Sequence, residues 1–245
     1  MSDDDAIPAA TLVVMTADPV PRLLMVERAA KMAFAAGMWV FPGGRVDPED
    51  MAIADRLGLP GEGARVAALR ETIEESGIAP GLGLADADAR SLQSALHRGT
   101  SLADQVDVDR LRAAITALTP FARWKPSFAQ PRKFDTMFYL AASPSGPPAP
   151  RPQPGECVAA EWVSARAMLD RIAAGSARAI FPTKRNLERL ACFDGLDEAV
   201  ADARAFPVDT IVPWIEPRDG KDHVVIPADR GYPVTSEPLA SAFRR

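Results

Sequence analysis

Residues 70–78 read Arg-Glu-Thr-Ile-Glu-Glu-Ser-Gly-Ile, and they close a stretch that begins near Glu62 and has the apolar spacing of a helix. Gly77 stands where helices commonly end. On a helical wheel, three apolar residues share an arc of about 60°, and three glutamates share an arc of about 100° on the opposite side. The apolar set is Val66, Leu69 and Ile73, and the acidic set is Glu71, Glu74 and Glu75. The stretch therefore predicts a helix that docks on a sheet and gathers three carboxylates.

This cluster of glutamates is costly for the helix by itself. Glu71 faces Glu74 and Glu75 along the helix, and like-charge pairs at these spacings destabilise an isolated helix. All three also lie near the C-terminal end, where the helix dipole disfavours negative charge. A bound divalent cation would offset both costs, and carboxylate oxygens suit Mg²⁺ or Mn²⁺. The alternative interpretation is a solvated acidic face that holds no ligand.

A glycine pair upstream strengthens the metal interpretation. Gly43 and Gly44 follow a short apolar run, residues 38–41, that predicts a strand. Because glycine has no side chain, the backbone here can approach a phosphate or a metal closely. Arg70 precedes the first glutamate, where it can pair with a carboxylate and orient it.

Gly44 and residues 70–78 together resemble the Nudix box, G-x5-E-x7-R-E-U-x-E-E-x-G-U, of the Nudix hydrolases. The second half matches at every fixed position, although Thr72 replaces the usual bulky aliphatic residue. The first half is split. Counting forward from Gly44 reaches Asp50, whereas counting back from Arg70 reaches Glu62. Residues 51–62 are therefore extra, and either acid could take the role of the first glutamate of the box.

The resemblance implies a fold and a reaction. The fold is of the α/β (α+β) class, an α/β/α sandwich with a central mixed sheet and a helical insertion after the Nudix helix. The reaction is the hydrolysis of a diphosphate linkage in a small-molecule nucleoside diphosphate derivative, with Mg²⁺ or Mn²⁺ as cofactor. A catalytically silent Nudix-fold module that binds a ligand is the alternative from a different class.

The same resemblance implies a role for each residue of the box. Glu74 and Glu75 are metal ligands, together with the carbonyl of Gly44. Glu71 is a further ligand or the general base, and Arg70 orients the carboxylates. Two more candidates for the base lie outside the box, near the strand after a proline-rich loop: Glu156 and Glu161. Each of these two could instead be an exposed acid at the edge of a strand.

Four further segments resemble one branch of the family, the coenzyme A and acyl-coenzyme A diphosphatases of the large peroxisomal type. They are residues 40–50, 122–126, 132–138 and 181–187. This branch implies cleavage of (acyl-)coenzyme A to 3′,5′-ADP and (acyl-)4′-phosphopantetheine. ADP-ribose, dinucleotides and nucleoside triphosphates are the alternative substrates within the family.

The phosphates of such a substrate need partners besides the metal. Arg28 and Arg132 are the basic candidates, because an arginine can contact a phosphate through two N–H groups. Either could instead be a solvated surface cation. Gly43 and Gly44 offer backbone contacts to the same phosphates. The aromatic candidates for stacking on adenine, which could equally belong to the core, are Trp39, Phe41 and Trp124.

Composition limits the class of protein further. The 245 residues are 47% hydrophobic and 25% charged, which excludes a disordered or fibrous chain. A net charge of −5 argues against a nucleic-acid partner. No apolar run reaches the roughly 18 residues of a membrane span, and the acidic N-terminus is unlike a signal peptide. We expect a cytoplasmic enzyme with no membrane partner, and the sequence leaves a homodimer open.

Strand-like and helical segments intermix along the chain, which favours one Nudix domain over residues 1–245. Its insertions are expected at about 51–62 and 82–120, and a C-terminal extension at about 196–245. Residues 86–118 predict two or three short helices, residues 143–154 a proline-rich surface loop, and residues 184–191 a helix with Thr183 as its N-cap. The expected strands are residues 11–15, 23–26, 38–41, 134–141, 156–163, 211–215 and 223–226.

Overall fold

The computed structural model describes residues 6–32, 34–125 and 133–242. The strands are β1 (Ile7–Met15), β2 (Leu23–Arg28), β3 (Trp39–Val40), β4 (Gly43–Arg45), β5 (Thr119–Trp124), β6 (Phe134–Ala142), β7 (Cys157–Val163), β8 (Thr210–Ile211), β9 (Trp214–Arg218), β10 (Lys221–Val225) and β11 (Ser236–Pro238). The helices are α1 (Pro48–Arg56), α2 (Gly63–Ser76), α3 (Asp86–His97), α4 (Leu102–Gln105), α5 (Val108–Ala117), α6 (Ala165–Ala173), α7 (Phe181–Leu190), α8 (Leu196–Ala205) and α9 (Leu239–Ala242).

A mixed sheet forms the centre of the molecule. Its strand order is β3-β2-β1-β6-β5-β8, with β4 also paired to β1 and β7 to β2. β1 runs parallel to β6 over its whole length, from Ile7 opposite Phe134 to Met15 opposite Ala142. β1 and β2 are antiparallel, which confirms the predicted strand pair. The proline-rich residues 143–154 connect β6 to β7 as a loop, as predicted.

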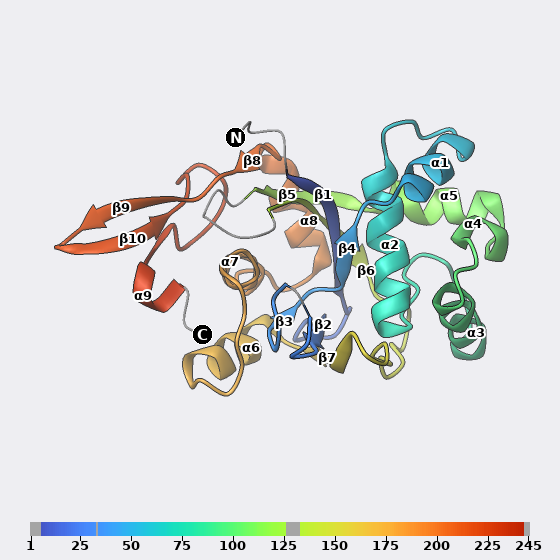
Figure 1. The fold of residues 1–245 in the computed structure, drawn as a ribbon, viewed down its shortest axis with the longest axis horizontal. Coiled ribbons are helices and arrows are strands. Elements are labelled where there is room, and N and C mark those ends of the chain that lie inside the picture. Colours follow the sequence, from blue (N-terminus) through green and yellow to red (C-terminus); the bar gives the residue numbers. More distant parts are fainter. Residues whose placement is uncertain (1–5, 33, 126–132, 243–245) are drawn as a thin grey trace.

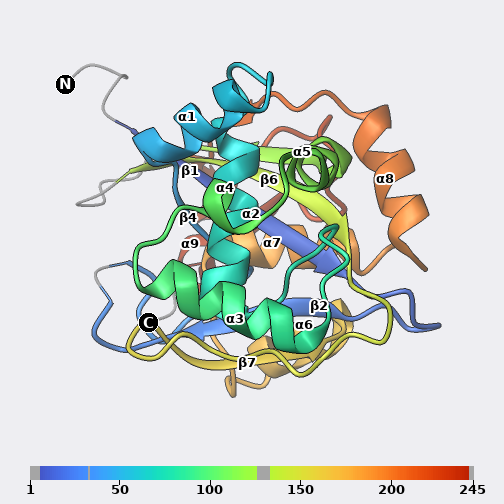
Figure 2. The same ribbon diagram turned by 90° about the vertical axis from the view of Figure 1, so that its right-hand side faces the viewer.

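Helices cover both faces of this sheet (Figures 1 and 2). Alternation along β1 sets the two faces, because successive side chains of a strand point to opposite sides. Leu12 and Val14 pack with Ala68 of α2, whereas Val13 and Met15 belong to the core that includes α6, α7 and α8. Each such buried aliphatic side chain stabilises the fold by roughly 1.5–3 kcal/mol. The expected α/β/α sandwich with a central mixed sheet is confirmed.

The residues that follow α2 form the helical insertion expected from the sequence. Leu69 and Ile73 of α2 pack against Leu111 and Ile115 of α5, and α1 and α3 join the same apolar cluster. The face expected to dock on the sheet therefore packs on helices instead, and the small residues Ala67 and Ala68 allow α2 to lie against the sheet. α2 therefore lies between the sheet and a second layer of helices, which explains why its acidic end is poorly exposed. Across the described residues, no helix combines the length and the apolar character that crossing a membrane requires.

Two expectations about local structure are wrong. The helix expected from Thr183 begins at Phe181 instead, with Ile180 at the N-cap position and Pro182 in the first turn. Proline favours this place, because its missing N–H has no helical partner there. The strand expected over residues 211–215 is split at Pro213, a residue that cannot donate a ladder hydrogen bond.

The two halves of that split strand join different sheets. β8 runs parallel to β5 at the edge of the central sheet. β9 pairs with β10, and β10 with β11, so the described residues contain a second, smaller sheet. The β9–β10 hairpin projects from the body of the molecule (Figure 1).

Candidate active site

The acidic helix predicted from residues 62–76 is α2, and Gly77 ends it as expected. Gly77 has a φ of 68°, in the left-handed region that glycine adopts readily, and its N–H donates to the carbonyl of Ile73 at 2.8 Å. The side chains of Glu71 and Glu74 are 15% and 20% exposed, whereas that of Glu75 is 1% exposed. The acidic side of the helix is therefore buried, not a solvated face.

The two glycines of β4 lie directly against this helix. The N–H of Gly43 donates to Oε2 of Glu75 at 3.0 Å. A Cβ atom on Gly44 would lie 2.4 Å from Cδ and Oε1 of Glu71. No other residue fits at Gly44 unless that carboxylate moves, so the glycine is required for the close approach of β4 to α2.

Arg70 holds the carboxylates together. Its guanidinium donates to both oxygens of Asp50 at 2.9 Å, to Oε1 of Glu71 at 2.9 Å and to Oε2 of Glu74 at 3.3 Å. Burial works to lower the pKa of Arg70, but the hydrogen bonds and the negative charges of these acids raise it overall. Glu62 pairs with Arg65 at 2.7 Å instead. Of the two acids that the split box left open, Asp50 is the one in contact with Arg70.

Asp50 is itself held in place. It has no exposed surface, and its Oδ2 accepts the backbone N–H of Asp47 at 2.8 Å in the capping box of α1. A capping box satisfies the free N–H groups at the start of a helix. Asp50 therefore joins the start of α1 to Arg70 on α2.

Burial raises the pKa of all three glutamates of α2. It raises the pKa of Glu75 to about 8, with repulsion from Glu71 adding to the shift, while Arg28 and the N–H of Gly43 oppose it. Burial also raises the pKa of Glu71 to about 7, against the attraction of Arg70. The pKa of Glu74 is raised for the same reason. Two arginines do not fully compensate these carboxylates.

The donor set fits a divalent cation. Glu71 and Glu74 accept hydrogen bonds from Arg70. Oε1 of Glu75 accepts from Nη1 of Arg28 at 3.1 Å. In the described ranges, no group of three or more His, Cys, Asp or Glu side chains is gathered as a ready metal cage. The three carboxylates nevertheless share two helical turns, are poorly compensated and carry the hard oxygen donors that Mg²⁺ and Mn²⁺ prefer.

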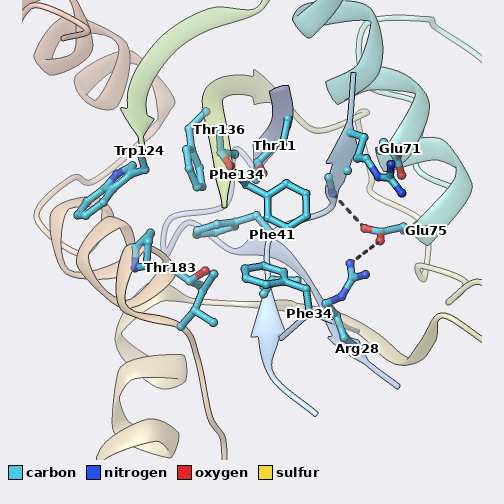
Figure 3. A pocket seen from close by; sticks show the side chains of 18 of the residues that line it. Thr11, Arg28, Phe34, Phe41, Glu71, Glu75, Trp124, Phe134, Thr136 and Thr183 are labelled. Atoms are coloured by element: carbon cyan, nitrogen blue, oxygen red, sulfur yellow. Dashed lines mark hydrogen bonds and ion pairs between the residues drawn. The ribbon is translucent and has the colours of Figure 1, made fainter. Parts of the chain in front are cut away.

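A cavity of about 470 Å³ opens beside α2 and β4. Figure 3 shows Glu71 and Glu75 on one side of it and Trp124 and Thr183 on the other, with three phenylalanines between them. Its charged lining residues are Arg28, Arg45, Asp47, Glu71, Glu75, Lys133 and Glu156. Its aromatic lining residues are Phe34, Phe41, Trp124, Phe134 and Phe138. Acids, cations and flat apolar surfaces thus share one cavity.

Most residues singled out from the sequence meet at this cavity, but Arg70 and Glu74 of α2 are not among the residues that line it. Glu156 lines it together with Arg28 and both glycines of β4. Glu161 forms an ion pair with Arg171 and does not line the cavity. Trp39, Phe41 and Trp124 all belong to the buried core, and Phe41 and Trp124 also line the cavity. Arg132 lies outside the described residues.

The structure adds an aromatic pair that the sequence interpretation missed. Phe34 and Phe134 are partly exposed, and their ring centroids lie 5.0 Å apart on the cavity wall. They are 100 residues apart in sequence, so no local pattern could have paired them. The run Lys133-Phe134, a cation followed by an aromatic residue, was the available signal for one of the two.

Comparisons with known proteins agree with this geometry. A family profile described as the NUDIX domain matches residues 6–183. The crystal structure of a NUDIX hydrolase from Alicyclobacillus acidocaldarius is similar to this chain, with a TM-score of 0.64 and 32% identity, covering 82% of this chain and 97% of that one. A Caenorhabditis elegans protein named "Putative nudix hydrolase 7" is 30% identical over an alignment of 141 residues, and the match covers 54% of this chain and 43% of the relative.

The family match includes β4, the whole of α2 and most of the cavity wall. The chain belongs to the Nudix family. Its match to the C. elegans relative spans less than half of that relative's length.

Proposed function

We propose that this chain is a divalent-cation-dependent diphosphatase that hydrolyses (acyl-)coenzyme A to 3′,5′-ADP and (acyl-)4′-phosphopantetheine. The observation that carries the diphosphatase activity is the placement of Glu71 and Glu75 beside Gly44, at the wall of a cavity that also holds cations and aromatic rings. Buried, poorly compensated acids destabilise the fold, so they are not expected at the binding cavity of a catalytically silent module.

The residues of α2 and β4 have separate roles in the proposed site. Glu71, Glu74 and Glu75, with the carbonyl of Gly44, would hold Mg²⁺ or Mn²⁺. The bound cation would neutralise charge on the diphosphate oxygens and make an attacking water more acidic. Arg70 orients Glu71 and Glu74 through its hydrogen bonds to them.

Two residues of the cavity are the leading candidates for the general base. Glu71 is the first, as the alternative to its role as a cation ligand, because its carboxylate lines the cavity beside Gly44. Glu156 is the second, because it lines the cavity from the chain just before β7. Glu161 is the weakest candidate, since its carboxylate forms an ion pair with Arg171.

The choice of coenzyme A rests on the branch resemblance and on the lining of the cavity. Coenzyme A carries a diphosphate, a 3′-phosphate and an adenine. Arg28 and Lys133 line the cavity and offer cationic partners for phosphates. Phe34 and Phe134 offer partly exposed flat faces to an adenine. Other nucleoside diphosphate derivatives share the diphosphate and the base, so a substrate panel is needed to separate them.

The test is product chromatography with wild type and Glu75→Gln side by side, each with Mg²⁺, Mn²⁺ or EDTA. The panel is coenzyme A, acetyl- and longer acyl-coenzyme A, ADP-ribose, NADH, diadenosine polyphosphates and nucleoside triphosphates. We expect cation-dependent release of 3′,5′-ADP from the coenzyme A compounds, lost in the variant. Turnover of another compound alone would reject coenzyme A and keep the diphosphatase. Turnover that neither EDTA nor the substitution affects would reject the proposed site.

A further inference from the structure

The wall of the cavity that lies across from α2 depends on a part of the chain that the family match does not include. Trp124 and Thr183 line this wall, and Figure 3 places them on the far side from Glu71 and Glu75. The family match ends at residue 183. Residues that follow it pack behind the wall, and two sets of contacts connect them to it.

The first connection is a buried chain of hydrogen bonds. Nε1 of Trp124 donates to the hydroxyl of Tyr232 at 3.0 Å, and that hydroxyl donates to Oδ1 of Asn186 at 2.7 Å. Trp124, Tyr232 and Asn186 are 1%, 5% and 0% exposed. The hydroxyl of Tyr232 accepts one hydrogen bond and donates another, so both neighbours fix its direction.

Ring packing reinforces this connection. The rings of Trp124 and Tyr232 meet edge to face, with centroids 5.5 Å apart and an interplanar angle of 85°. The ring of Phe181, at the start of α7, also packs against Trp124, with centroids 6.1 Å apart and an interplanar angle of 80°. The indole is therefore fixed by two perpendicular rings and by one hydrogen bond in the plane of its own ring.

The second connection anchors α7 itself. Glu237 of β11 is buried and accepts from Lys184 at 2.7 Å and from Arg185 at 2.8 Å. These two residues directly follow Pro182 and Thr183, which line the cavity. Charge-assisted hydrogen bonds of this length are among the stronger ones in proteins.

We propose that Tyr232 is a positioning residue, which holds Trp124 in the cavity wall and thereby sets the affinity for the adenosine end of the substrate. The inference rests on the proposed function for the identity of that substrate. Tyr232 does not line the cavity and acts through Trp124. Loss of its hydroxyl alters binding and leaves the acids of α2 untouched, so KM changes and kcat does not.

The test compares the two tyrosines of the chain. Tyr232→Phe keeps the ring and removes the bridging hydroxyl. Tyr139→Phe is the matched control, because Tyr139 is equally buried but packs with α2 on the other face of the sheet, away from the cavity lining. We expect Tyr232→Phe to raise KM about three- to tenfold, the size expected from one lost hydrogen bond, with kcat within about twofold. Tyr139→Phe should change neither.

A second variant shows whether the hydroxyl acts through Trp124. Trp124→Phe should raise KM, and the double variant should raise it no further than Trp124→Phe alone. Additive effects on KM would overturn the inference. So would a Tyr232→Phe variant that melts at a lower temperature but keeps the wild-type KM, because that result describes a purely structural contact.

The indole N–H signals of the four tryptophans in an NMR spectrum test the hydrogen bond without any measurement of activity. The Trp124 signal is the one missing from Trp124→Phe, and Tyr232→Phe should shift that signal most. An unmoved signal would mean that the hydrogen bond is absent. If no panel compound is hydrolysed, the proposed function fails, and ADP binding decides the inference. A dissociation constant raised about three- to tenfold by Tyr232→Phe supports it, and an equal constant or no binding overturns it.

Discussion

The guanidinium of Arg70 donates two hydrogen bonds of 2.9 Å to the carboxylate of Asp50, and Asp50 has no exposed surface. The two residues belong to different helices, with an inserted stretch between them. Asp50 accepts from Nε and Nη2 of Arg70, which leaves Nη1 to donate to Glu71 and Glu74. The contact thus fixes the orientation of the acidic helix from outside that helix. Three substitutions with matched controls test the site, and a labelling experiment tests the packing of β7.

Asp50→Asn should lower kcat about 10- to 100-fold, as loss of a partner behind metal ligands typically does. Arg70 would lose the charge of its buried partner, and the free energy of unfolding should fall by about 2 kcal/mol. Glu62→Gln is the control, because Glu62 is half-exposed and pairs with Arg65, and it should change stability by less than about 0.5 kcal/mol. Initial rates and urea unfolding measure both effects. Equal rates for the two variants would contradict the role given to Asp50.

Glu75→Gln should weaken Mn²⁺ binding at least about tenfold by calorimetry, because a neutral amide is a poor ligand for a hard cation. Glutamine keeps the shape of the side chain and can still accept the N–H of Gly43, so the variant should fold. Glu161→Gln removes an acid that pairs with Arg171 away from the cavity and should bind Mn²⁺ like wild type. Identical binding isotherms for all three proteins would show that the cation does not bind on α2.

Gly44→Ala should reduce activity about 100-fold, since the added Cβ would lie 2.4 Å from the carboxylate of Glu71 and displace it. Gly195→Ala is the matched control, because a Cβ there meets nothing within 4 Å and the backbone is extended. Kinetics and thermal melting of both variants give the comparison. An active, cation-dependent Gly44→Ala enzyme would mean that β4 does not need to approach Glu71 so closely.

The two cysteines should differ sharply in reactivity. Burial raises the pKa of the Cys157 thiol to about 12, so only about one molecule in ten thousand carries its thiolate at pH 8. Cys192 is exposed. Iodoacetamide at pH 8 should label Cys192 alone, and Cys157 should react only after unfolding or as the pH rises toward 12. Mass spectrometry that found both thiols labelled at equal rates in the folded protein would contradict the packing of β7.

Local patterns in the sequence predicted the elements whose causes are local. The wheel pattern of Leu69 and Ile73, with Gly77 after it, was sufficient for α2 and its end, because helix periodicity and a left-handed glycine depend only on neighbouring residues. The wrongly predicted start of α7 also has a local cause. The helix predicted to follow Thr183 begins three residues earlier because Pro182 suits a first turn, a signal that the sequence already contained.

Pairings between distant residues could not be predicted. Spacing alone left Asp50 and Glu62 equivalent, because the path of the inserted residues decides which acid returns to Arg70. The meeting of Phe34 with Phe134 likewise depends on the sheet, whose order β2-β1-β6 brings the chain after β2 near the start of β6. The acidic helix, the glycines and two of the aromatic lining residues were therefore predictable, whereas the choice of Asp50 as the partner of Arg70 and the pairing of Phe34 with Phe134 were not.

The most direct test of the cation-dependent activity is the initial rate of 3′,5′-ADP release from coenzyme A as Mg²⁺ is titrated, in wild type and Glu75→Gln. We expect a rate that rises to saturation with Mg²⁺ in wild type, vanishes with EDTA and falls at least about 100-fold in the variant at saturating cation. A rate that Mg²⁺ does not change, or that Glu75→Gln leaves intact, would contradict a cation-dependent diphosphatase on α2.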